Sequence, residues 1–172
     1  MVKHPGADGQ TLIRDQECIL ARWVEHFEGV LNRESTILED AISQLPQSPI
    51  IEEMSNPPTI IEVTKAIKQM SSGKAPGADG IPPEVYKCGG NIITVRLTQL
   101  FTIIWHCETV PQEFRNSTIV HLYKQKGNRH HCDNHRGISL LSIAGKILGR
   151  VITNQLTHAA ADNILPESQC GF

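Results

Sequence analysis

Apolar residues recur every three or four positions along four stretches of the chain. In the first stretch, Ile19, Trp23 and Phe27 fall on one helical face, and Asp15 stands where a helix N-cap is expected. The same period returns three more times further along the sequence. The spacing predicts helices over residues 15–31, 91–108 and 140–158, and a short helix with Val63, Ala66, Ile67 and Met70 on one face.

One stretch has a different period. Residues 117–123 alternate between apolar and polar side chains and are rich in β-branched types, which predicts a strand followed by a polar loop over residues 124–134. Pro82 and Pro83 suit the first turn of a further helix, where a missing amide hydrogen is harmless. The fold class expected from these elements is α+β and rich in helix.

A proline-rich segment separates the first helix from the rest. Residues 33–58 hold four prolines among Ser, Gln and Asn, which is typical of a linker, with one short helix near residues 37–45. We therefore expect an N-terminal extension over residues 1–58, with one amphipathic helix and this linker. Residues 59–172 are expected to form a separate domain.

Charge is distributed unevenly along the 172 residues. The formal net charge is −2, yet residues 1–62 carry four Lys or Arg against eleven Asp or Glu, whereas residues 63–152 carry twelve against five. A basic block of this kind is typical of a surface that faces nucleic acid, although a solvated charged face would give the same count.

Several features favour an intracellular protein. No apolar run approaches the roughly 20 residues that cross a bilayer, so no membrane partner is expected, and the N-terminus lacks the apolar core of a signal peptide. The five cysteines are odd in number and irregularly spaced, which argues against a disulfide framework and agrees with a reducing compartment.

The segment GKAPGADGIP, residues 73–82, is the strongest candidate for function. Three glycines and two prolines allow a fixed, exposed loop, and Lys74 gives it a cation that suits a polyanion. The structural loop residues are Gly73, Pro76, Gly77, Asp79 and Gly80. A nucleotide-binding P-loop is excluded. In the P-loop motif the lysine follows the glycines and opens a helix, whereas in this chain Lys74 precedes Pro76 and Gly77. The alternative interpretation is a rigid turn that joins two helices.

Further donors follow the predicted strand. Residues 124–131, KQKGNRHH, concentrate cationic and amide groups that suit phosphates or an incoming triphosphate, although a solvated hairpin would have the same composition. Arg136 offers a planar fork of donors for phosphate. The alternative for Arg136 is a structural arginine that bonds carbonyls at the start of the next helix, where Ser139 is the expected cap.

Histidines and a cysteine in the same region raise the question of a metal. His130, His131, Cys132 and His135 lie close in sequence, but zinc sites usually combine two separated pairs of ligands, and no second pair is evident. We expect no metal ligand here and assign no catalytic residue.

Five blocks of sequence resemble motifs of one protein family, and they occur in the same order as in that family. They are GKAPGADGIP at residues 73–82, IVHLYKQKG at residues 119–127, NHRGISLLS at residues 134–142, GKI at residues 145–147 and QCGF at residues 169–172. They resemble the reverse transcriptase domain of non-LTR (LINE-like) retrotransposons. Upstream, RWVEHF at residues 22–27 is similar to a segment that precedes the polymerase in such elements.

The resemblance implies a fold and an activity. It implies the fingers portion of a right-hand polymerase, truncated over residues 59–172, with the palm and thumb missing. The parent enzyme would copy an RNA template from a DNA primer with Mg²⁺ held by aspartates, and would be found in cytoplasm and nucleus. Those aspartates lie beyond the last block, so we expect a fragment that is inactive alone, binds no cofactor and lacks its palm partner.

The resemblance also selects the candidate contact residues. Lys74, Lys124, Lys126, Arg136 and Lys146 stand in the matching blocks, and the resemblance implies contact with nucleic acid or nucleotide. Two alternatives from other classes remain open. One is a stand-alone remnant that binds nucleic acid without chemistry, and the other is an inert, unstable fossil.

Overall fold

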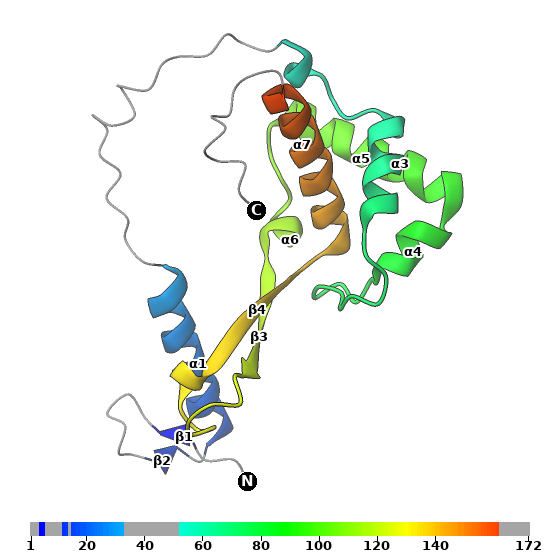
Figure 1. The fold of residues 1–172 in the computed structure, drawn as a ribbon. Coiled ribbons are helices and arrows are strands. Elements are labelled where there is room, and N and C mark those ends of the chain that lie inside the picture. Colours follow the sequence, from blue (N-terminus) through cyan, green and yellow to red (C-terminus); the bar gives the residue numbers. More distant parts are fainter. Residues whose placement is uncertain (1–3, 6–11, 14, 33–51, 162–172) are drawn as a thin grey trace, which may run out of the picture. The chain divides into compact units, whose positions relative to one another are not determined.

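The computed structural model describes residues 4–5, 12–13, 15–32 and 52–161 (Figure 1). The chain divides into two compact units, and each unit is built from two separate stretches of the sequence. Unit 1 comprises Met1–Pro46 with Ile119–Ser139, and unit 2 comprises Gln47–Thr118 with Leu140–Phe172. Helices dominate and two small sheets accompany them, which confirms the predicted helix-rich α+β class.

Unit 1 is organised around one buried tryptophan. Trp23 lies on helix α1, Gln16–Leu31, which begins at the predicted cap: the Asp15 carboxylate accepts from the backbone N–H groups of Glu17 and Cys18. The Trp23 ring stacks on His121 at 4.0 Å between centroids and on Phe27 at 5.7 Å. Only 6% of Trp23 is exposed, so this aromatic stack is the core of the unit.

Two pairs of strands occur in the described residues. Strands β1, His4–Pro5, and β2, Leu12–Ile13, pair antiparallel with His4 opposite Ile13. Strands β3, Ser117–Tyr123, and β4, His135–Leu141, form the second sheet. A short 3-10 helix, η2, Cys132–Asn134, precedes β4. The predicted strand over residues 117–123 is therefore confirmed, whereas β4 was not predicted.

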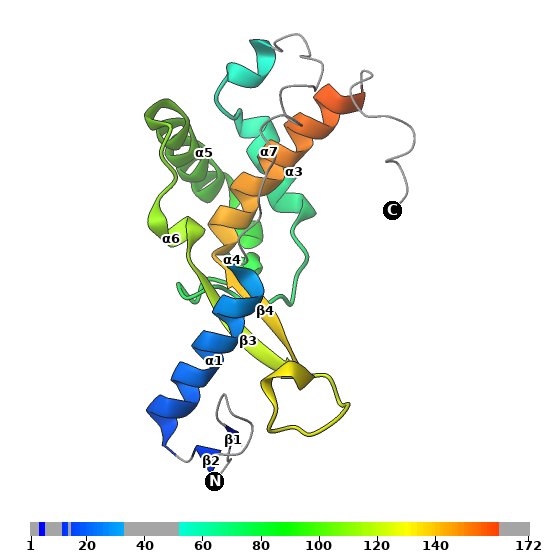
Figure 2. The same cartoon turned by 90° about the vertical axis from the view of Figure 1, so that its left-hand side faces the viewer.

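Unit 2 is a group of helices with a shared apolar core. The helices in its described residues are η1 Glu52–Ser55, α3 Ile60–Gln69, α4 Pro83–Cys88, α5 Gly90–Cys107, α6 Gln112–Arg115 and α7 Ile143–Ala161. Helix α3 packs against both α5 and α7, and Figure 2 shows these three helices together from a second side. The fully buried side chains include Val63, Phe101, Ile143, Ile147 and Val151, which come from all three helices.

Most helix predictions are confirmed, and their ends follow local chemistry. Helix α3 begins at Ile60 because Thr59 and Glu62 form a capping box. The Glu62 backbone N–H donates to the Thr59 hydroxyl, and the Glu62 carboxylate accepts from the Thr59 backbone N–H. Pro83 opens α4 as expected. The predicted helix over residues 37–45 lies outside the described residues. The predicted domain limits at residues 58 and 59 stay a prediction.

The start of α7 corrects the sequence analysis. The prediction placed a helix from Leu140 with Ser139 as its cap, but β4 continues through both residues and the helix begins at Ile143. Ser142 is the cap, since its hydroxyl oxygen accepts from the Gly145 N–H at 3.0 Å. Among the described residues, no helix combines the length and apolar character that a membrane crossing requires.

Candidate nucleic-acid interface

The loop that carries Lys74 is held at its entry by two bonds to α4. The Gly73 N–H donates to the Glu84 carboxylate at 2.6 Å, and the Lys87 ammonium donates to the Ser72 hydroxyl at 3.0 Å. The bond from Gly73 holds the pKa of Glu84 below its ordinary value, and the Glu84 backbone N–H and the Lys87 charge act in the same direction. These two bonds therefore fix the position of the backbone directly before Lys74.

The tip of the loop is a hydrogen-bonded turn. The Gly80 N–H donates to the Gly77 carbonyl at 3.1 Å, and the Asp79 carboxylate accepts from the Ile81 N–H at 3.1 Å. Gly73 and Gly80 adopt positive φ angles of 70° and 68°, which other residues adopt at a cost. Gly80 and Asp79 therefore have structural roles in the turn, and Gly73 has one at the entry of the loop.

Gly77 brings the loop against the start of α7. A Cβ atom on Gly77 would lie 2.6 Å from the Ser142 backbone nitrogen and 2.7 Å from the Leu141 carbonyl carbon. Both neighbours are backbone atoms, so they cannot move aside as a flexible side chain could. The absence of a side chain at Gly77 is what allows the loop to lie beside the helix that carries Lys146.

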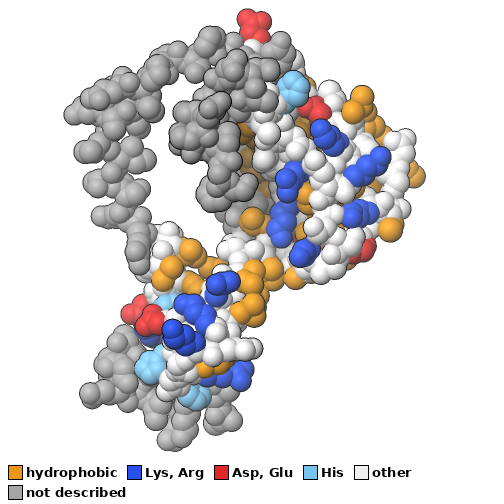
Figure 3. Space-filling model, in the orientation of Figure 1, with side chains coloured by type: hydrophobic (Ala, Val, Ile, Leu, Met, Phe, Trp, Pro, Cys, Tyr) orange, Lys and Arg blue, Asp and Glu red, His pale blue; other side chains and the backbone are white. Residues whose placement is uncertain are grey.

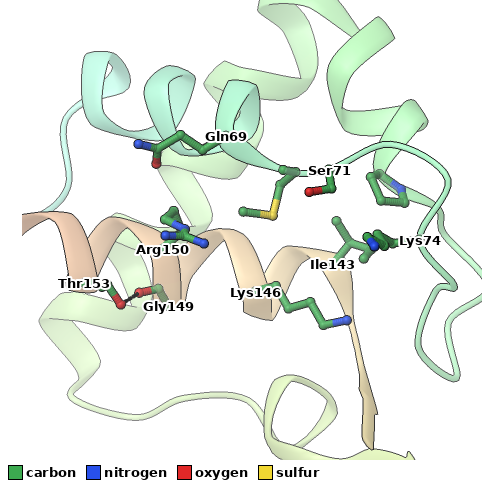
Figure 4. Close-up of a pocket in the computed structure, with 10 residues that line it drawn as sticks. Gln69, Ser71, Lys74, Ile143, Lys146, Gly149, Arg150 and Thr153 are labelled. Atoms are coloured by element: carbon green, nitrogen blue, oxygen red, sulfur yellow. Dashed lines mark hydrogen bonds between the residues drawn. The ribbon is translucent and has the colours of Figure 1, made fainter. Parts of the chain in front are cut away.

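Lys74 and Lys146 line one pocket, together with a cation that the sequence analysis missed. Lys146 and Arg150 are four residues apart on α7 and therefore share a face of the helix. The pocket lies between the end of α3, the loop and α7, and we call it the α3–α7 pocket (Figure 4). Its volume is about 460 Å³, and its lining residues are Gln69, Met70, Ser71, Lys74, Pro83, Ile143, Lys146, Gly149, Arg150 and Thr153.

The charges around this pocket have one sign. Within the described parts of the chain, Lys74, Lys146 and Arg150 form no ion pair with a carboxylate. Lys74 and Arg150 are exposed and Lys146 is half-buried. Figure 3 shows Lys and Arg side chains gathered over the region of α3 and α7, with few acidic ones among them. Neighbouring cations repel one another, so an anion bound among them would lower the electrostatic energy.

The remaining candidates lie in unit 1 and have different environments. The Lys124 ammonium donates to the Asp133 carbonyl at 2.8 Å, and the Lys124 backbone N–H donates to the Asn134 carbonyl at 2.8 Å. Lys124 therefore closes the loop between β3 and β4. Arg136 is exposed on β4 and lines a second pocket of about 490 Å³ with Lys124. Lys126 is exposed in the loop and lines neither pocket.

The histidine and cysteine segment has structural contacts in unit 1. His135 is 6% exposed, and its Nε2 lies 2.8 Å from the Arg129 carbonyl. Burial raises the pKa of the Cys132 thiol, which favours its uncharged form. Across the described ranges, no three His, Cys, Asp or Glu side chains lie together as metal ligands.

One missed residue could have been found from the sequence. Arg150 follows Lys146 by four positions inside the predicted helix, so the two were predictable neighbours. The contributions of Gln69 and Thr153 depend on how α3 packs on α7, and the sequence pattern carries no signal for that contact.

The chain is similar in sequence to proteins of mobile elements. No family model matches the chain. It is 27% identical over 67% of its length to the probable RNA-directed DNA polymerase from transposon BS of Drosophila melanogaster, and 27% identical over 69% to the RNA-directed DNA polymerase from mobile element jockey of Drosophila funebris. It is 25% identical over 94% of its length to the uncharacterized 149 kDa protein of transposon TX1 of Xenopus laevis.

The chain spans 13% of the length of each of these relatives. The three matches extend over different shares of the chain, and each exceeds half of it. They confirm the resemblance to the polymerase proteins of non-LTR retrotransposons that the five sequence blocks indicate.

Proposed function

We propose that this chain provides part of the fingers of a retrotransposon RNA-directed DNA polymerase, and that the α3–α7 pocket holds the phosphate backbone of the template or primer strand. The observation that supports this most directly is the meeting of Lys74 with Lys146 and Arg150 around one pocket. In this proposal the described residues bind and position nucleic acid and take no part in the chemical step.

The chemistry of the three cations suits phosphate. Arginine offers parallel N–H donors that match two phosphate oxygens, and lysine supplies a compact charge on a flexible stem. Contacts of this kind fix the position of a strand without reading its sequence. A polymerase must hold any template in the same way, so contacts to the backbone are the kind it needs.

The loop geometry supports the same role for Lys74. Glu84 anchors the loop entry, and Gly77 lies against the α7 start, so the backbone that carries Lys74 is held on two sides. A cation on a positioned loop loses less conformational entropy on binding than one on a free loop. Lys126 and Arg136, which are exposed in unit 1, are proposed as further contacts to nucleic acid or nucleotide.

Substitution of the pocket cations tests the proposal. The probe is a fluorescein-labelled RNA template annealed to a shorter DNA primer, and binding is measured by fluorescence anisotropy at fixed ionic strength. We expect Lys74→Gln, Lys146→Gln and Arg150→Gln each to raise the Kd about 3- to 10-fold, since each removes a charge-assisted contact.

Arg96→Gln is the matched control. Arg96 is an exposed cation of the same unit, on α5, and bonds Gln99 at 3.2 Å rather than lining the α3–α7 pocket. Its Kd should equal that of the unchanged chain, and circular dichroism should show the same helix content for all four variants. Equal loss in the control and the pocket variants would contradict a role for this pocket.

A further inference from the structure

The neighbours of Gly149 do not explain why this position holds a glycine. It lies inside α7 on an exposed position, and a Cβ atom built there would meet no atom within 4 Å. Glycine in a helix interior is less favourable than alanine because it loses more conformational freedom on folding. The described residues therefore neither require nor use the open space at Gly149.

The open space belongs to the α3–α7 pocket. Gly149 lines this pocket between Lys146 and Arg150, so bare helix backbone forms the wall beside the two cations. Thr153 lines the same wall, and its hydroxyl donates to the Gly149 carbonyl at 2.7 Å, a bond that Figure 4 draws. A ligand held by Lys146 and Arg150 could approach the helix backbone here more closely than any side chain would allow.

The pocket is also larger and more varied than a phosphate contact requires. Its volume of about 460 Å³ falls in the range of sites that hold a whole small molecule. Half-buried Met70 gives it an apolar wall above the buried Pro83 and Ile143, beside the polar Gln69. The Gln69 amide oxygen accepts from the Asn154 side-chain NH₂ at 2.9 Å, which orients the amide of Gln69. Apolar surface and an oriented amide are what a nucleobase needs in addition to the cations that its phosphate needs.

We propose that the α3–α7 pocket receives one unpaired nucleotide of a single strand. Its phosphate lies among Lys74, Lys146 and Arg150, its sugar lies against the α7 backbone at Gly149, and its base covers the apolar part. A base inside a duplex is stacked and paired and cannot enter such a pocket without leaving the stack, so the site favours single-stranded over double-stranded nucleic acid. This inference rests on the proposed function, because it takes the same three cations as the phosphate site.

Gly149→Ala tests the inference, and Gly29→Ala is its control. Gly29 is also an exposed glycine inside a helix, α1, with no atom within 4 Å of an added Cβ, and it belongs to unit 1. Both substitutions should leave the melting temperature unchanged or raise it by about 2 °C, because alanine favours the helix. Binding is measured for a single-stranded RNA oligonucleotide and for a blunt RNA–DNA duplex of the same length.

The expected result separates the two probes. Gly149→Ala should raise the Kd for the single strand about 3- to 10-fold and leave the Kd for the duplex unchanged, whereas Gly29→Ala should change neither. An unchanged Kd for the single strand, or an equal rise for both probes, would overturn the nucleotide pocket and leave the phosphate contacts standing. Failure of the unchanged chain to bind either probe would instead contradict the proposed function, and the inference with it.

Discussion

At the scale of single residues, Glu84 is the side chain that positions the basic loop. Its carboxylate accepts the Gly73 N–H at 2.6 Å, one residue before Lys74. A carboxylate that accepts a backbone N–H is stabilised in its charged form, which is why its pKa lies below the ordinary value of 4.5. Protonation would weaken the bond that holds the loop entry.

The depressed pKa predicts how Glu84 affects stability at different pH values. Because the folded-state pKa lies below the unfolded one, the stabilisation is present above pH 4.5 and is lost as the pH falls through the folded-state pKa. Glu84→Gln should therefore be less stable than the unchanged chain in urea unfolding at neutral pH. The difference should shrink as the pH is lowered through the folded-state pKa, because Glu84 then becomes protonated in both states. A difference of equal size at neutral and at acidic pH would contradict the charge of Glu84 as its cause.

The sequence predicts which residues carry a charge, but not where each charged side chain lies in the fold. Lys74 and Lys146 were both named as contacts, and the structure brings them to one pocket. Lys124 was named for the same role, but its ammonium donates to the Asp133 carbonyl inside its own loop. The sequence gives the charge of a lysine, but it does not show which nearby carbonyl accepts a hydrogen bond from the ammonium group.

At the scale of elements, the junction between β4 and α7 determines where Lys146 and Arg150 lie. Ser142 ends the strand region and caps the helix, with its hydroxyl oxygen accepting from the Gly145 N–H. The sequence pattern instead points to Ser139 as the cap, because the apolar residues Leu140 and Leu141 continue the helical pattern without a break. A strand of seven residues that runs directly into a helix leaves no turn residues as a signal of the boundary.

The corrected cap is open to a direct test. Ser142→Ala should lower the free energy of unfolding by about 1 kcal/mol, because it removes the acceptor for a helix N-terminal N–H. Ser139→Ala is the control, since Ser139 is exposed on β4 and should change stability by less than about 0.5 kcal/mol. Both values come from urea unfolding followed by circular dichroism. A larger loss at Ser139 than at Ser142 would restore the cap that the sequence suggested.

At the scale of the whole molecule, the pattern of apolar residues was sufficient for the helices. The predicted helices over residues 15–31 and 91–108 correspond within a residue to α1 and α5, because each has a continuous apolar face and a clear end. The pairing of β3 with β4 was not predicted, since only one of the two strands alternates clearly. The aromatic stack on Trp23 joins α1 to residues about 100 positions away, and no local pattern reports such a contact.

The charge of the whole chain makes the salt dependence of binding informative about the pocket cations. The formal net charge is −2, so binding of a polyanion must depend on a local group of cations rather than on overall attraction. Lys74, Lys146 and Arg150 are that group in this account. Each cation that contacts a phosphate releases a counterion and adds about 0.7 to 0.9 to the slope of log affinity against log salt concentration.

The measurement we would make first is the salt dependence of RNA binding by the unchanged chain and by the triple variant Lys74→Gln, Lys146→Gln, Arg150→Gln. We expect affinity to fall as the salt concentration rises, and the slope of the triple variant to be smaller by roughly 2 to 3 units. The triple variant would have to keep the slope of the unchanged chain to contradict the claim that this pocket contacts phosphate.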